Sequence, residues 1–144
     1  MKEYPGKLIS ILYRKSQSFF AQMLKEHGLT SAEYPVMILL LKKDGRTQEE
    51  LSAELVIDKS AITRVVQSLV EKGFVEKQKD AIDKRCNHIY LTEQGLRCKT
   101  SIEQTMEEWN DIQTKNIPTE QLDELMRLLH QIVDNVQDQL ERHK

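Results

Sequence analysis

The chain has 144 residues, of which 39% are hydrophobic and 31% charged, so it suits a single domain that can bury a core. It contains no run of about 20 apolar residues, and charges interrupt its apolar N-terminus, so we expect a cytoplasmic protein without a membrane helix or signal peptide. Taken alone, the net charge of −2 argues against DNA binding, but the acidic surplus is confined to residues 100–144, where ten Asp and Glu accompany four Lys and Arg.

The first helix is predicted over residues 7–27, where apolar side chains recur at three- and four-residue steps. Thr30 and Glu33 form a capping box, which predicts that a second helix opens there and continues through residues 36–43. Most of this segment is apolar on every side, so the second helix should lie at the centre of the core.

A helix-turn-helix is predicted for residues 47–70. Thr47 and Glu50 form another capping box at the start of its first helix, and Asp58 is placed to cap the second. The outer face of this second helix carries small side chains, one Arg and one Gln: Ser60, Ala61, Thr63, Arg64 and Gln67. Such a face can enter a major groove and hydrogen-bond with base edges. The alternative is an ordinary helical hairpin with a polar exterior.

Two strand-like runs, residues 74–78 and 87–91, follow the helix-turn-helix and predict a β-hairpin wing. Its polar tip includes Arg85, and an arginine on a thin ribbon fits the minor groove of DNA. Asp83 is placed to hold the Arg85 guanidinium by a charge-assisted hydrogen bond. The alternative is a solvated charged loop.

Residues 34–95 resemble the DNA-binding core of the MarR family of bacterial transcription regulators. The resemblance is carried by TQEELSA (47–53), DKSAITR (58–64), LVEKGFV (69–75), DAIDKR (80–85) and IYLTEQG (89–95). It implies a mainly α fold with a small β-hairpin wing, and a homodimer that binds a palindromic operator in double-stranded DNA. It also implies that Arg85, paired with Asp83, is the wing-tip arginine. Lys77 stands where many relatives have arginine, and lysine lacks the planar fork of a guanidinium.

With this resemblance, DNA contacts are expected from both helices of the helix-turn-helix and from the wing: Thr47, Gln48, Asp58, Lys59, Ser60, Ala61, Thr63, Arg64, Gln67, Lys77, Lys84 and Arg85. The whole chain is expected to form one MarR-type domain, 1–144. Within it, we expect a winged helix-turn-helix lobe at 30–95 (helix-turn-helix 47–70, wing 74–91) and dimerisation helices at 1–28 and 96–144.

The C-terminal part is predicted to form two more helices. Thr92 should cap one that runs to about residue 116, with Gly95 as a weak point, and Thr119 should cap another that runs to about residue 142. The apolar residues of the last helix follow a nearly heptad pattern. Such a stripe needs a partner, so we expect the first helix and the last two helices to form an intersubunit bundle; packing within a monomer is the alternative.

The chain contains residues of three types through which a regulator can respond to a signal: aromatic side chains, cysteines and histidines. Each type corresponds to one kind of signal. The first is a small aromatic effector in a crevice lined by Tyr13, Phe19, Phe20, Met23, Met37 and Trp109, although these residues also suit a packed core. The second is thiol oxidation at Cys86 or Cys98, which both have basic neighbours. The third is a metal, but the four histidines are scattered, and we expect neither a metal site nor a cofactor.

The sequence contains no GxSxG, GxxxxGK[ST] or HExxH motif, so an enzyme is not expected. We expect a dimeric transcription regulator, a repressor released by a small-molecule ligand. A thiol-based redox-sensing regulator is one alternative, and a winged-helix module that binds only protein is another. A protein-binding module would need apolar anchors on the face that carries Ser60, Thr63, Arg64 and Gln67, which are poor ones.

Overall fold

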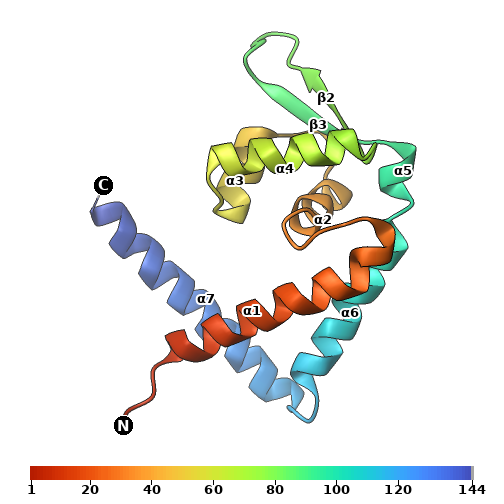
Figure 1. Ribbon diagram of the computed structural model, residues 1–144. Helices are drawn as coiled ribbons and strands as arrows, with labels where there is room; N and C mark the ends of the chain where they lie inside the picture. The colour runs from red at the N-terminus through yellow and green to blue at the C-terminus, as the bar shows by residue number, and fades with distance from the viewer. Residues whose placement is uncertain (144) are drawn as a thin grey trace. The chain divides into compact units, whose positions relative to one another are not determined.

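The computed structural model describes residues 1–143. Two compact units make up the chain, Met1–Trp109 and Asn110–Lys144. The elements in chain order are α1 (Pro5–Leu24), the 3₁₀-helix η1 (Lys25–His27), α2 (Tyr34–Lys42), β1 (Arg46–Thr47), α3 (Gln48–Leu55), α4 (Lys59–Glu71), β2 (Val75–Lys79), β3 (Asn87–Leu91), α5 (Glu93–Leu96), α6 (Lys99–Thr114) and α7 (Thr119–Arg142) (Figure 1). This mainly helical fold with a small antiparallel sheet confirms the predicted fold class. Among the residues described, no helix has the length and apolar character that crossing a membrane requires.

Helix α2 lies at the centre of the core of the first unit, as its composition predicted. Val36, Met37 and Leu40 are each at most 1% exposed. They belong to one apolar cluster with Leu51 of α3 and with the buried stripe of α4, which consists of Ile62, Val66 and Leu69. Burying a side chain of this size stabilises a fold by roughly 1.5–3 kcal/mol, so this cluster holds the two helices of the helix-turn-helix in place.

The predicted caps at the starts of α3 and α4 are present. Thr47 accepts a hydrogen bond from the Glu50 N–H at 3.0 Å, and Asp58 accepts one from the Ser60 N–H at 3.0 Å. These bonds satisfy backbone donors that have no partner within the helix, and therefore fix where each helix begins.

The sheet has the strand order β1-β3-β2, with antiparallel pairing throughout. Strands β2 and β3 form the predicted wing, although β2 spans Val75–Lys79 and begins one residue later than expected. The short strand β1 was not predicted, because two residues show no alternation. It pairs Thr47 with His88, and Thr47 also caps α3, so the wing and the helix-turn-helix are joined at one residue.

The helix predicted to run from Thr92 to about residue 116 is in fact two helices, α5 and α6. Thr92 caps α5, as predicted, by accepting from the Gly95 N–H at 3.1 Å. Gly95 is buried, and a Cβ atom added to it would lie 2.1 Å from the Phe74 carbonyl oxygen. The close contact fixes α5 against the segment before β2, and a new helix starts at Lys99.

The prediction that Thr119 caps the last helix was wrong. Pro118 is the N-cap of α7, and no side chain caps it by a hydrogen bond. The N–H groups of Gln121 and Leu122 both donate to the Pro118 carbonyl at 3.0 Å. Proline, with φ −61° and ψ 149°, supplies the extended conformation that the residue before a helix needs. None of the described residues of α7 is buried.

Candidate DNA-binding surface

The outer face of α4 is polar and open to solvent. Ser60, Thr63, Arg64 and Gln67 are exposed, and Ala61 is half-buried. The Ser60 hydroxyl donates to the Asp58 carboxylate, and the Thr63 hydroxyl donates to the Lys59 carbonyl at 3.0 Å. The hydrogen bonds from the Ser60 hydroxyl and N–H lower the pKa of Asp58 below its usual value, so this cap stays ionised.

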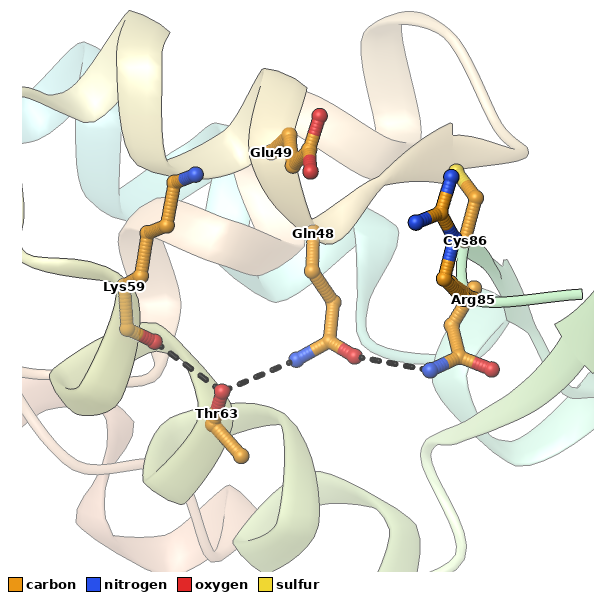
Figure 2. A pocket seen from close by; sticks show the side chains of 7 residues that line it. Gln48, Glu49, Lys59, Thr63, Arg85 and Cys86 are labelled. Carbon is orange, nitrogen blue, oxygen red and sulfur yellow. Dashed lines mark hydrogen bonds between the residues drawn. The ribbon is translucent and has the colours of Figure 1, made fainter. Parts of the chain in front are cut away.

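Gln48 of α3 connects α4 with the wing. Its Nε2 atom lies 3.4 Å from the Thr63 hydroxyl, and its Oε1 atom lies 3.5 Å from Nδ2 of Asn87, as the dashed lines in Figure 2 mark. A hollow of about 160 Å³ lies among these elements and is lined by Gln48, Glu49, Lys59, Thr63, Arg85, Cys86 and Asn87. The structure thus brings expected residues from α3, α4 and the wing together around one hollow.

The wing tip holds the hydrogen bond predicted between Asp83 and Arg85. Arg85 Nε lies 3.2 Å from Asp83 Oδ1, and the Arg85 N–H donates to the same oxygen at 3.1 Å. The Arg85 side chain is nevertheless 93% exposed, so the bond orients the guanidinium without covering it. At the base of the wing, Lys77 Nζ lies 3.4 Å from Gln67 Oε1, which links β2 to α4. Lys84 is exposed beside Arg85.

Sequence reasoning missed three residues of this surface, namely Asn87, His88 and Asp80. His88 Nε2 lies 2.8 Å from Asp80 Oδ1, and His88 Nδ1 lies 2.8 Å from the Gly45 carbonyl. Hydrogen bonds from the Asp83 N–H, from His88 and from the Ile82 N–H lower the pKa of Asp80 to about 2. Asp80 belongs to the DAIDKR segment quoted above, but the sequence does not show that it meets His88, because that contact depends on the pairing of β2 with β3.

The residues proposed for an effector crevice have different environments. Phe20 and Met37 are buried in the core, and Phe20 stacks on Tyr34 with ring centroids 4.2 Å apart. Phe19 packs against Trp109 with centroids 5.0 Å apart. Tyr13 and Met23 are exposed. A separate hollow of about 220 Å³ lies between α2 and α6 and is lined by Ile38, Leu41, Lys42, Lys99, Ile102, Glu103 and Met106.

Both cysteines have surroundings that disfavour the thiolate. Burial, and then the nearby carboxylates of Asp80 and Glu49, raise the pKa of the Cys86 thiol, while burial raises the pKa of Cys98. Because the thiolate is the form that reacts with oxidants, these environments do not favour thiol sensing.

A model of the MarR family matches residues 27–85. The solved structure of a MarR transcriptional regulator from Methanosarcina mazei Go1 is 33% identical to this chain, with a TM-score of 0.88, and the alignment covers 95% of this chain and 99% of that one. The chain belongs to the MarR family. It is also similar to the multiple antibiotic resistance protein MarR of Escherichia coli K12, at 27% identity over 89% of this chain and 90% of that protein.

A further MarR-family structure bears on the fold. A putative regulator from Listeria monocytogenes, solved with a 26mer DNA, is 22% identical and has a TM-score of 0.89 over 96% of this chain and 91% of that one. The proteins from Methanosarcina mazei and Listeria monocytogenes are described as a transcriptional regulator and a putative transcriptional regulator of the MarR family. This protein is accordingly a MarR-family transcriptional regulator with a DNA-binding winged helix-turn-helix.

Proposed function

We propose that this protein is a dimeric repressor that binds a palindromic operator and is released from it by a small aromatic ligand. The observation that carries the proposal is the two-sided character of α4. This helix buries Ile62, Val66 and Leu69 and exposes Thr63, Arg64 and Gln67 beside a wing whose terminal arginine is 93% exposed.

In the proposed complex, α4 enters the major groove. Arg64 and Gln67 have the side chains that make bidentate contacts with guanine and adenine edges, while Ser60, Ala61 and Thr63 are small enough to let the helix approach closely. Gln48 lies at the start of α3 and Asp58 at the start of α4, where the Gln48 amide and the backbone N–H groups reach the phosphate backbone, while the buried Thr47 acts by capping α3. Lys59, Lys77 and Lys84 neutralise phosphates, and Arg85 enters the minor groove, with Asp83 as the residue that orients it.

The proposed dimer is supported by apolar side chains that are exposed to solvent on α1 and α7. In the first unit, α1 exposes Leu8, Ile9 and Leu12. In the second unit, α7 exposes a stripe formed by Leu125, Met126, Leu128, Leu129, Val133, Val136 and Leu140. Exposed apolar stripes of this length are characteristic of subunit interfaces. We therefore assign dimerisation to residues 1–28 and 96–144, and DNA binding to the lobe at 30–95.

The proposed ligand site is the hollow between α2 and α6. Ile38, Leu41, Ile102 and Met106 supply apolar walls of the kind that hold an aromatic ring. Lys42 supplies positive charge, and Lys99 also lines the hollow, 3.9 Å from the Glu103 carboxylate. A ligand here would contact the central helix of the DNA-binding lobe directly. It would release the operator if it bound more tightly to the form of the protein that does not fit DNA. Repression follows because a compact dimer on an operator blocks polymerase without an activation surface.

The experiment that tests the function is a fluorescence-anisotropy titration of the purified protein. The duplexes are the promoter region upstream of its own gene and a scrambled sequence of equal length, each at two salt concentrations. Tight binding to the promoter that weakens with salt is the expected result. Equal binding to both duplexes would contradict operator recognition, and no binding at low salt would contradict a role on DNA. Aromatic acids and phenols are then added to the bound complex, and release is the expected response.

A further inference from the structure

The His88 side chain sits between the wing and the loop that precedes β1. Its Nδ1 atom lies 2.8 Å from the Gly45 carbonyl oxygen, and its Nε2 atom lies 2.8 Å from Asp80 Oδ1. The His88 and Asp80 side chains are 27% and 31% exposed, so solvent reaches the pair only partly. Both ring nitrogens therefore have a close oxygen partner at the same time.

Both partners of His88 are hydrogen-bond acceptors. The Gly45 carbonyl has no proton, and the Asp80 carboxyl, with a pKa of about 2, is ionised at neutral pH. A neutral imidazole carries one N–H group and an imidazolium carries two. Only the imidazolium can donate to both oxygens, so the observed geometry corresponds to a protonated His88.

The elements packed against His88 favour this charge. Thr47 of β1 and Gln78 of β2 pair with His88 across the sheet, and both are uncharged. Asp80 and, from α3, Glu50 are the carboxylates whose charges act on the ring, and both stabilise a positive charge there. Two cationic side chains on the neighbouring strands, Arg46 of β1 and Lys77 of β2, have partners other than His88. Arg46 donates to the Leu39 carbonyl and pairs with Glu54, and Lys77 bonds to Gln67 of α4.

Asp80 connects His88 with the conformation of the wing tip. While Oδ1 of Asp80 contacts His88, its Oδ2 accepts hydrogen bonds from the N–H groups of Ile82 at 3.0 Å and Asp83 at 2.9 Å. Asp83 then accepts from both the N–H and the Nε of Arg85. A continuous series of hydrogen bonds thus leads from the Gly45 carbonyl through His88, Asp80 and Asp83 to the wing-tip guanidinium.

We propose that His88 is a positioning residue of the wing, which as an imidazolium fastens the tip turn at Asp80 to the Gly45 carbonyl and so sets the direction in which Arg85 meets DNA. The proposal rests on the proposed function, since it gives the wing a contact with DNA. Loss of the proton removes one of the two donors. The neutral ring can donate to only one of the two oxygens, so it no longer links the tip turn at Asp80 to the Gly45 carbonyl, and the direction of Arg85 is less strictly set.

The pH dependence follows from the direction of the shift. The hydrogen bond to the Gly45 carbonyl, and then the bond to Asp80, raise the pKa of His88 above its usual 6.5. A raised pKa in the ordered wing means that the fastening is complete at low pH and is lost as pH rises through that value. DNA affinity should fall over the same range, by roughly tenfold, as expected for loss of one charge-assisted hydrogen bond.

The first test uses the full-length protein without DNA. Nitrogen-detected NMR of the imidazole rings, from about pH 6 to about pH 9, reports whether one or both ring nitrogens of His88 carry a proton. We expect both to be protonated at the low end of this range, one of them to lose its proton at a pH above the ordinary 6.5, and the amide signals of Ile82 and Asp83 to shift with the same titration. A single protonated nitrogen throughout this range, or tip amides that do not respond, would overturn the proposal.

The second test measures affinity over the same pH range for a duplex selected from a random library by the wild-type protein. His88→Gln should bind more weakly at low pH and lose the pH dependence. Asp80→Asn keeps an oxygen that can accept from the tip turn but removes the negative charge beside His88. The fall of DNA affinity with rising pH should therefore occur at a lower pH in this variant. His27→Gln, in η1, is the matched control and should follow the wild type. A His88→Gln profile identical to that of the wild type would refute the role of His88. Failure of the wild type to select any duplex would instead refute the proposed function. The NMR titration would still show whether His88 binds Asp80 and the Gly45 carbonyl at the same time.

Discussion

Arg64 differs from the hydroxyl residues on the same face of α4. Ser60 and Thr63 already donate their hydroxyl protons within the helix, to Asp58 and to the Lys59 carbonyl. Gln67 contacts both Glu71, at 3.3 Å, and Lys77. Arg64 has five N–H donors on a planar group and is exposed, so it is the side chain best suited to reading a base.

We predict that Arg64→Ala weakens binding to the operator by roughly 1–3 kcal/mol, because a bidentate contact with a base edge is lost. Anisotropy titrations of the variant and the wild type against operator and scrambled duplexes check this. The loss should be larger on the operator. An equal loss on both duplexes would mean that Arg64 acts only through its charge.

Residue-scale features were predictable from sequence where the partners are neighbours in the chain. Asp83 and Arg85 are two residues apart, and the bonds of Thr47 with Glu50 and of Thr30 with Glu33 each span three, so spacing alone identified these pairs. The Thr30–Glu33 pair closes a turn rather than opening a helix at Thr30, since α2 begins at Tyr34. The contact between Gln48 and Asn87 spans 39 residues. It depends on where the sheet brings β3 relative to α3, and no local pattern contains that information.

At the scale of elements, a buried carboxylate joins the end of α4 to the start of α2. Glu33 is 2% exposed and accepts from Lys72 Nζ at 2.6 Å, from the Ser68 hydroxyl at 2.6 Å and from the Thr30 N–H at 2.9 Å. Lys72 Nζ also donates to the Gly28 carbonyl at 2.8 Å. The sequence identified Glu33 only as part of a capping box, since Lys72 is 39 residues away.

We predict that Glu33→Gln lowers the free energy of unfolding by roughly 1–3 kcal/mol at about pH 7, because Lys72 loses its buried counter-charge. Burial raises the pKa of Glu33, but the hydrogen bonds from Lys72, Ser68 and Thr30 outweigh it and lower the pKa below the usual 4.5. A lowered pKa stabilises the fold above the unfolded value and loses that effect as pH falls through the folded value. The difference between variant and wild type should therefore shrink in acid.

Urea unfolding at a series of pH values measures this difference. Glu26→Gln is the matched control, because the Glu26 side chain is 80% exposed and the change should stay within about 0.5 kcal/mol. Equal stabilities of the two variants at neutral pH would show that the buried ion pair does not hold α4.

The junction between the wing and α5 depends on Gly95. A Cβ atom added to Gly95 would lie 2.1 Å from the Phe74 carbonyl oxygen, so there is no room for any side chain at this position. We predict that Gly95→Ala destabilises the protein by roughly 1–3 kcal/mol, the usual effect of overpacking. Gly6→Ala is the control, since nothing lies within 4 Å of a Cβ there and the helical position should be stabilised. Thermal unfolding of both variants gives the comparison, and similar melting temperatures would contradict the prediction.

The existence of the long helices was predictable, but two of their limits were not. The division between α5 and α6 follows from the contact of Gly95 with Phe74, which lies 21 residues earlier in the chain. Thr119 has a side chain typical of an N-cap, but it is the first residue of α7. The N-cap position is occupied by Pro118, whose backbone is extended. In both cases, the residues near the boundary indicated one helix limit, and contacts or backbone conformation in the folded chain produced another.

At the scale of the whole molecule, the proposed dimer sets how much of an operator the protein would contact. A two-fold dimer reads half-sites about 34 Å apart, one turn of the double helix, so a monomer would contact only one of them. We predict that Val136→Lys, which puts a charge in the C-terminal half of the exposed stripe of α7, weakens dimerisation at least about tenfold. Gln131→Lys adds the same charge to the polar face of the same helix and should leave the dimer intact.

Sedimentation equilibrium of the two α7 variants measures the dimer dissociation constant. Operator affinity should fall with dimer stability in Val136→Lys and remain unchanged in Gln131→Lys. A Val136→Lys protein that stays dimeric would place the subunit interface elsewhere.

The Gln48 contacts also bear on the entropy of recognition. Because it contacts both Thr63 and Asn87, the Gln48 amide favours one orientation in the free protein and so has less rotamer freedom to lose. Binding then fixes fewer side chains, so less of the interaction with DNA is offset by lost conformational entropy. Because the two bonds are long, at 3.4 and 3.5 Å, they are easily exchanged for contacts with a nucleotide. The Gln48 side chain is thus oriented before binding and is still able to move toward a nucleotide.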